Sequence, residues 1–393
     1  MSIDYTYEDL KMMAMSEAFA ADASQKKRIF YNYREFLSDI HFIFVDENGI
    51  DAISPFRKMF NLNESNLVSM FSKDTLNVIN EDILNGKTEI SFSCDIGLDT
   101  QIISYIERYV RGVLDEHLVS TIKPLQIKRT LESEINIDAY IFENYLKNRQ
   151  LDKIGKLSVW SVYYFLNIPL MNEIDAQIKA DEALKSIDNY INYSPRTRIY
   201  LDRYYLCYSF LLKIVKLHFE NISLKEKLIK LIAFENEEIF TIATMFINLA
   251  VAFWEQGTKL RFFGKVQKGK KDIIEVLQNM AWDLTHWVNT TLDCVYSDNF
   301  KSDLFVNLFY SIDNRFLELK NILKMECIAI DKKEKKAFPY YKNELDKFFT
   351  FEEQREFYGE SALHKRNLYR KTVDTKELAT KLKKELLDTN LFI

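Results

Sequence analysis

The stretch that decides the fold runs from Lys271 to Met325 and contains KDIIEVLQNMAWDLTHWVN (271–289), LFVNLFYSID (304–313) and NRFLELKNIL (314–323). Apolar residues recur at steps of three and four in the first segment, which predicts an amphipathic helix. The second segment is a short apolar run that ends on Asp313, and the third is again amphipathic. The stretch therefore predicts a buried strand between two helices.

Two carboxylates stand at the edge of the predicted core in this stretch. Asp283 lies beside the buried face of the first helix, and Asp313 lies where the strand meets the second helix. An acid close to a core costs free energy unless something compensates its charge. A metal ion would compensate both acids.

Composition limits the classes of protein that the chain can belong to. Its 393 residues leave room for two or three domains, and 9 Gly and 5 Pro favour a mostly helical protein. A net charge of −5 argues against binding nucleic acid through bulk charge, but not against an enzyme with a local basic patch. Four distant cysteines form no CxxC pair, so neither a zinc knuckle nor a disulfide scaffold is predicted.

One segment, IFTIATMFINLAVAFW (239–254), has no charged residue but is only 16 residues long. A membrane span needs about 20 apolar residues, so we expect a buried core helix and no membrane association. The N-terminus lacks the basic and apolar regions of a signal peptide. We therefore expect a cytoplasmic protein.

Two more acids occupy positions of interest. Asp99 lies in the turn between an alternating segment (Ile90–Cys94) and a helical one (Ile102–Val110), and Glu143 lies among apolar residues of INIDAYIFENYLKNR (135–149). Ligands of parallel sheets bind at the carboxyl ends of the strands, so Asp99 and Asp313 would share a crevice if their strands are neighbours. Several carboxylates together suit Mg²⁺ or Mn²⁺.

Four segments resemble the acidic motifs of PIN-like nucleases, in the same order: LDTQIISYI (98–106), FEN (142–144), AWDLTHW (281–287) and YSIDNRFLEL (310–319). The resemblance implies a three-layer α/β/α core with a small parallel sheet and a divalent metal, Mg²⁺ or Mn²⁺. It implies that the catalytic metal ligands are Asp99, Glu143, Asp283 and Asp313. Thr100 and Asn314 would line the site.

The resemblance also implies a domain organisation. Residues 1–88 would be an N-terminal helical region, 89–330 the PIN-like core, and 331–393 a charged helical tail. The 140 residues between Glu143 and Asp283 exceed the spacing of a minimal PIN domain, so a helical insertion at about 150–270 is expected in this helix-rich α/β protein. Long members of this type resemble toxins or effectors of anti-phage defence.

Each candidate residue also has a simpler interpretation. Asp99 and Asp313 could be helix N-caps, and Glu143 a solvated helix residue. His286 could line the site or pack in the core, and Asp95 could assist Asp99 or face solvent. A basic cluster could hold a phosphate backbone or be a solvated face; it consists of Lys259, Arg261, Lys265, Lys268, Lys270 and Lys271.

Two functions are compatible with these features. The first is a metal-dependent endoribonuclease, in which a metal-activated water attacks the phosphorus of RNA, or less readily of DNA. The second is a catalytically inactive interaction or regulatory protein on a PIN-like scaffold. A regulatory partner or homo-oligomerisation is compatible with both.

Overall fold

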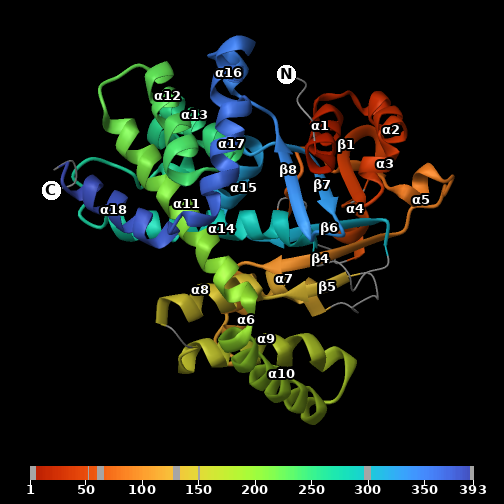
Figure 1. Cartoon of the computed structure of the whole chain (residues 1–393). Helices are drawn as coiled ribbons and strands as arrows, with labels where there is room; N and C mark the ends of the chain where they lie inside the picture. Colours follow the sequence, from red (N-terminus) through yellow and green to blue (C-terminus); the bar gives the residue numbers. More distant parts are fainter. Residues whose placement is uncertain are drawn as a thin grey trace. The chain divides into compact units, whose positions relative to one another are not determined.

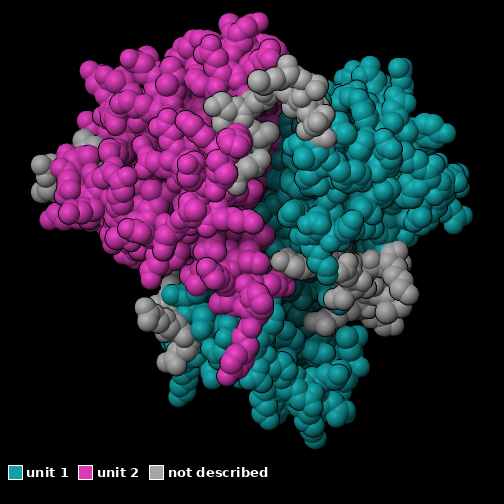
Figure 2. Space-filling view, in the orientation of Figure 1, with its two compact units in different colours: residues 1–192, 289–312, 324–340 teal, residues 193–288, 313–323, 341–393 magenta. Residues whose placement is uncertain are grey.

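A computed structural model describes residues 6–51, 53–59, 66–126, 133–148, 151–295 and 302–389 (Figure 1). It is rich in helices and contains two four-stranded sheets, in agreement with the predicted α/β class. The chain divides into two compact units (Figure 2). Unit 1 comprises residues 1–192, 289–312 and 324–340, and unit 2 comprises residues 193–288, 313–323 and 341–393. These discontinuous units differ from the predicted division at residues 88 and 330.

The first sheet of unit 1 has the strand order β3-β1-β7-β8. Its strands are β1 (Ile40–Asp51), β3 (Thr75–Ile79), β7 (Met325–Asp331) and β8 (Lys336–Tyr341). β1 pairs antiparallel with both β3 and β7. Three helices precede β1 in the chain: α1 (Tyr7–Ala20), α2 (Ala23–Asn32) and α3 (Arg34–Leu37).

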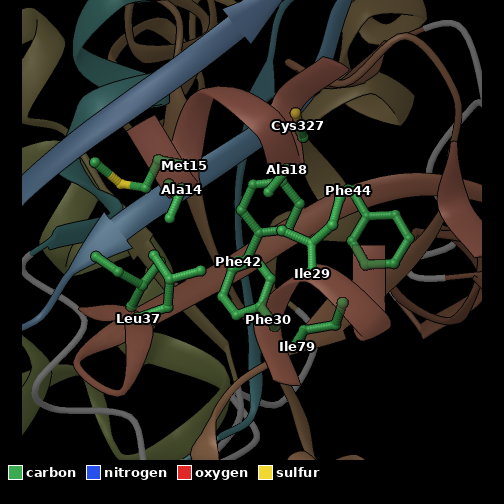
Figure 3. Close-up of a cluster of buried hydrophobic side chains, with 12 residues drawn as sticks. Ala14, Met15, Ala18, Ile29, Phe30, Leu37, Phe42, Phe44, Ile79 and Cys327 are labelled. Carbon is green, nitrogen blue, oxygen red and sulfur yellow. The ribbon is translucent and has the colours of Figure 1, made fainter. Parts of the chain in front are cut away.

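A hydrophobic cluster joins these three helices to one face of the first sheet (Figure 3). Phe42 of β1 lies at its centre, with ring centroids 5.1 Å from Phe30 of α2 and 5.7 Å from Phe44. The amine of Lys26 is buried beside the cluster, where it donates to the carbonyl of Ala18 at 2.6 Å and so ends α1. Burial of aromatic side chains provides the main stabilisation of this layer.

The predicted helical region 1–88 is wrong in part, because it contains β1, β2 (Leu67–Ser69) and β3 as well as α1–α5. α4 (Ser54–Met59) and α5 (Glu81–Leu84) are short. Phe42 and Phe44 face the helices, yet Ile43 between them is also buried. A strand that is buried on both faces has no apolar–polar alternation, so its period does not distinguish it from a helix. The predicted helical tail, 331–393, likewise contains a strand, since the whole of β8 lies within it.

The second sheet of unit 1 has the strand order β2-β6-β4-β5, with β4 (Phe92–Leu98), β5 (Ser133–Asn136) and β6 (Leu304–Tyr310). β4 runs parallel to β5 and β6, whereas β2 is antiparallel to β6, so the sheet is mixed. β4 and β6 are paired from Phe92↔Leu304 to Leu98↔Tyr310. The strands that lead to Asp99 and Asp313 are therefore neighbours.

The other helices of unit 1 follow the strands of this sheet. They are α6 (Thr100–Val110), α7 (Glu116–Ile122), α8 (Asp138–Asn148), α9 (Lys153–Asn167) and α10 (Glu173–Tyr193). Ile102, Ile103 and Ile106 make the buried face of α6, and they are spaced as the sequence predicts. Burial of this face holds α6, which follows β4 directly in the chain, in its place in the unit.

Unit 2 is built of helices. They are α11 (Pro195–Phe219), α12 (Leu224–Phe234), α13 (Thr244–Gln256), most of α14 (Ile273–Leu292), α15 (Asn314–Ile322), α16 (Phe351–Tyr358), α17 (Glu360–Tyr369) and α18 (Thr375–Leu387). α13 is buried over most of its length, as predicted for the uncharged segment. Within the described ranges, every helix is too short or too polar to cross a membrane. The four cysteines are buried and form no disulfide.

A buried acid connects the middle of unit 2 to its C-terminal helices. Glu235 begins a π-helical turn that ends at Phe240, whose φ of 55° is left-handed. Its carboxylate accepts hydrogen bonds from the backbone N–H of Ala243 at 3.0 Å and from the hydroxyl of Tyr358 at 3.2 Å. Burial raises the pKa of Glu235 to about 8, although both hydrogen bonds and the charge of Arg366 oppose this. Glu235 is therefore largely protonated in the folded protein at neutral pH.

The raised pKa of Glu235 predicts that unit 2 is more stable at acid than at neutral pH. The folded protein binds more protons than the unfolded chain between pH 4.5 and about 8, so the free energy of unfolding falls across this window. The loss is roughly 3 kcal/mol by pH 7, at about 1.4 kcal/mol per pKa unit. Urea unfolding should show this slope in the wild type, and the slope should become shallower by about this amount in Glu235→Gln. The exposed Glu237→Gln is the control, and an unchanged slope in Glu235→Gln would refute the prediction.

Candidate functional site

Asp99 lies where β4 ends and α6 begins. Its backbone N–H donates to the carbonyl of Tyr310 at 3.0 Å, which extends the pairing of β4 with β6 by one residue. Its side chain makes no capping hydrogen bond to α6. Instead, Asp99 Oδ2 accepts a hydrogen bond of 2.5 Å from the hydroxyl of the buried Ser311. The N-cap interpretation of the Asp99 side chain is therefore not realised.

Glu143 belongs to the same polar cluster. It is half-buried on α8, and its Oε2 accepts a hydrogen bond of 3.0 Å from the hydroxyl of Thr100, the first residue of α6. Asp99 and Thr100 are consecutive, so one turn of the chain contacts both Ser311 and Glu143. We call Asp99, Thr100, Glu143 and Ser311 the strand-end cluster. Ser311 was not singled out from the sequence, although it stands inside the motif YSID.

Asp313 belongs to unit 2 and acts as the N-cap of α15. Its Oδ1 accepts from the backbone N–H of Arg315 at 2.8 Å, and its Oδ2 lies 2.5 Å from the Arg315 guanidinium. Burial alone would raise the pKa of Asp313, but the hydrogen bonds and charge of Arg315, with a contribution from Lys265, hold it below the ordinary value. Asp313 is therefore a helix N-cap, which was the simpler of its two interpretations. The next residue, Asn314, is exposed.

Asp283 also belongs to unit 2, where it is half-buried on α14. His286, one turn later, is buried, and its ring is nearly parallel to that of Trp282 at a centroid distance of 6.0 Å. Trp282 stacks in turn on Tyr204 of α11 at 4.2 Å. This geometry matches the interpretation of His286 as a packing histidine.

The structure thus joins Asp99, Thr100 and Glu143 in unit 1, and Asp313 and Lys265 in unit 2. In the described part of the chain, no three His, Cys, Asp or Glu side chains are grouped so that they could hold a metal ion. The strand-end cluster offers carboxylate and hydroxyl oxygens, which are the donors that Mg²⁺ and Mn²⁺ prefer. The residues present therefore fit such an ion chemically.

The predicted basic cluster lies on the loop between α13 and α14. Lys259, Arg261, Lys265 and Lys268 are exposed, while the buried Phe262 and Phe263 anchor the loop. Lys270 forms a pair with Asp272 at 3.0 Å. The Lys268 amine lies 5.8 Å from the ring centroid of Phe219. The exposed members form a cationic surface, and Lys265 is close enough to Asp313 to affect its pKa.

Asp95 lies on the same face of β4 as Asp99, four residues earlier, and Gly97 lies between them. A Cβ atom at Gly97 would lie 3.1 Å from the Phe309 ring and 3.6 Å from Asn136 Oδ1, so the space above this glycine is occupied. The Asn136 amide donates to Asp95 Oδ2. Asp95 therefore interacts within the sheet rather than with solvent alone, as the sequence left open.

Comparison with known protein families, curated proteins and solved structures gives no match to this chain. The assignment of a function therefore depends on the residues described above.

Proposed function

We propose that this chain is a metal-dependent nuclease of the PIN-like type that hydrolyses phosphodiester bonds in RNA. One observation carries the proposal: the parallel neighbours β4 and β6 lead directly to Asp99 and Ser311, which are hydrogen-bonded to each other. Thr100 connects Glu143 to the same place. The carboxyl ends of adjacent parallel strands are where α/β proteins bind their ligands.

Asp99 and Glu143 would hold the metal ion. Ser311 and Thr100 each donate to one carboxylate oxygen, which restricts the rotation of that carboxylate and orients it. When bound, Mg²⁺ or Mn²⁺ would lower the pKa of a water molecule and stabilise the charge on the attacked phosphate. No protein nucleophile is required.

The exposed cations Lys259, Arg261, Lys265 and Lys268 would bind the phosphate backbone, and Lys270 would add to them. Such contacts make binding of nucleic acid fall steeply as salt increases. RNA is preferred to DNA in this proposal because the resemblance is to nucleases that cut RNA. The proposal includes a cytoplasmic role as a toxin or anti-phage effector, restrained by a partner or by self-association.

The test is an assay of the purified wild-type chain on end-labelled single-stranded RNA. Cleavage is expected with Mn²⁺ or Mg²⁺ and should stop when a chelator is added. Adding Mn²⁺ back should restore it, which excludes damage by the chelator. Intact RNA under every metal condition would count against a nuclease.

A second candidate function is an interaction or regulatory protein that has lost catalysis. The observation that favours it is the engagement of Asp313 by Arg315, which compensates a carboxylate that would otherwise face a metal. This candidate requires neither metal binding nor cleavage. Arg315→Ala removes the ion pair with Asp313 and so distinguishes the two functions. Cleavage of RNA could increase in this variant only if the protein is a nuclease.

A further inference from the structure

A row of polar residues crosses the second sheet midway along β4. Asp95 of β4 is in register with Asn307 of β6 and with Glu134 of β5. Residues in register on neighbouring strands lie about 4.8 Å apart and project from the same face of the sheet. Asp95 and Asn307 are therefore adjacent, although 212 residues separate them in the chain.

Two oxygen atoms of this row are buried and have no hydrogen-bond partner among the described residues: Asp95 Oδ1 and Asn307 Oδ1. The other polar atom of each side chain is engaged. Asn136 donates to Asp95 Oδ2, and Asn307 Nδ2 donates to the carbonyl of Thr290 at 2.9 Å. These hydrogen bonds fix the orientation of both side chains. If the Asn307 amide rotated by half a turn, it would lose its hydrogen bond to the carbonyl of Thr290. Two adjacent buried acceptors without a donor would cost free energy.

We propose that Asp95 remains a carboxylic acid in mildly acidic solution and donates the proton on Oδ1 to Asn307 Oδ1, so that a neutral hydrogen-bonded pair joins β4 to β6. One proton satisfies both oxygens. A protonated carboxyl group has one O–H donor and keeps an acceptor for Asn136. The proton thereby stabilises the pairing of the two strands whose ends lead to Asp99 and Ser311.

The charges around Asp95 oppose its ionisation. Glu134 of β5, Asp138 of α8 and Asp293, which follows α14, are the charged groups that act on it, and all three are acids. Burial raises the pKa of Asp95 to about 7, against the hydrogen bond from Asn136.

The sign of the pH effect follows from this raised pKa. Between pH 3.8 and about 7 the folded protein keeps a proton that the unfolded chain releases. The stability that the pair contributes is therefore greatest at acid pH and decreases as pH rises through this window. Asp95→Asn should remove the effect, because its amide donates to Asn307 permanently and its carbonyl still accepts from Asn136.

Hydrogen exchange of peptides that cover Phe92–Leu98 and Leu304–Tyr310 tests this locally. The ratio of wild-type to Asp95→Asn exchange cancels the ordinary dependence of exchange on pH. We expect a ratio near one at acid pH that rises at least about threefold above pH 7. Glu134→Gln removes the charge of the β5 residue that is in register with Asp95. Hydrogen exchange in this variant should keep the pH dependence of the wild type. A ratio that stays constant with pH would overturn the proposal.

Infrared spectroscopy supplies a second test that needs no change at Asp95. In Glu235→Gln protein, which lacks the other described acid whose pKa burial raises this far, a protonated-carboxyl band should persist near pH 6 and disappear at alkaline pH. Absence of the band near pH 6 would contradict a proton on Asp95. So would protection of β4 and β6 from hydrogen exchange that requires Mn²⁺ and is lost in Asp95→Asn.

Discussion

Asp99→Asn should abolish RNA cleavage while leaving the chain folded. The amide oxygen of asparagine can still accept the hydrogen bond from Ser311, so the end of β4 keeps its local contact. What the variant loses is the negative charge that attracts the metal ion. Loss of a supporting residue around a metal costs about 10–100-fold in affinity or activity, and loss of a ligand should cost more. The same result is expected for Asp283→Asn.

The control for this experiment is Asp115→Asn. Asp115 is the exposed N-cap of α7 in the same unit and, like Asp99, makes no side-chain capping hydrogen bond. Equal folding of both variants, judged by circular dichroism, is required before their activities are compared. Metal-free Asp99→Asn should melt at or above the wild-type temperature, because one of the two carboxylates of the strand-end cluster loses its charge. Full activity of Asp99→Asn in the presence of Mn²⁺ would refute the assignment.

Removal of one member of the Lys11–Asp331 pair should destabilise unit 1 by about 3–5 kcal/mol. The two side chains lie 2.5 Å apart, with only 4% and 2% of their surfaces exposed. Burial alone would raise the pKa of Asp331, but its hydrogen bond with Lys11 holds the pKa below the ordinary value. Lys11→Met leaves this carboxylate buried without its cation. The buried carboxylate without a counter-charge accounts for more of the expected cost than the loss of the Lys11–Asp331 hydrogen bond does.

Urea unfolding of Lys11→Met, Asp331→Asn and the double variant measures this cost. The double variant should recover part of the loss, since it leaves no uncompensated charge. Lys73→Met removes one member of the exposed Lys73–Glu47 pair, which has a similar N–O distance of 2.6 Å, and should cost far less than Lys11→Met. If Lys11→Met and Lys73→Met cost the same, the buried pair does not have the role described here.

The sequence predicted α6 and α14 from their three-and-four spacing, and it predicted the order of β6 and α15. The predicted alternating segment Ile90–Cys94 only overlaps β4, which begins at Phe92 and is buried on both faces. The same rules failed for β1, where residues on both faces are buried and the period is lost. They also failed for the mixed second sheet, because spacing along a chain does not specify strand direction.

The candidate site was predictable where acids follow strands, and less so where neutral residues make the contacts. Asp99 and Glu143 were found from their positions, and the structure places both in the strand-end cluster. Ser311 and Asn307 carry no charge and were not singled out from the sequence, so their contacts emerge only from the register of β4 with β6. Asp313 was predicted as a metal ligand, with a helix N-cap as the alternative, and the structure shows the cap.

Binding of Mn²⁺ to the folded chain is the most direct test of the proposed site. Isothermal titration calorimetry of the wild type, Asp99→Asn and Asp115→Asn separates metal binding from any choice of substrate. The account predicts that Mn²⁺ binds the wild type and Asp115→Asn and raises their melting temperatures by mass action, whereas Asp99→Asn shows neither effect. No binding to the wild type, or equal binding to Asp99→Asn, would contradict a metal site at the end of β4.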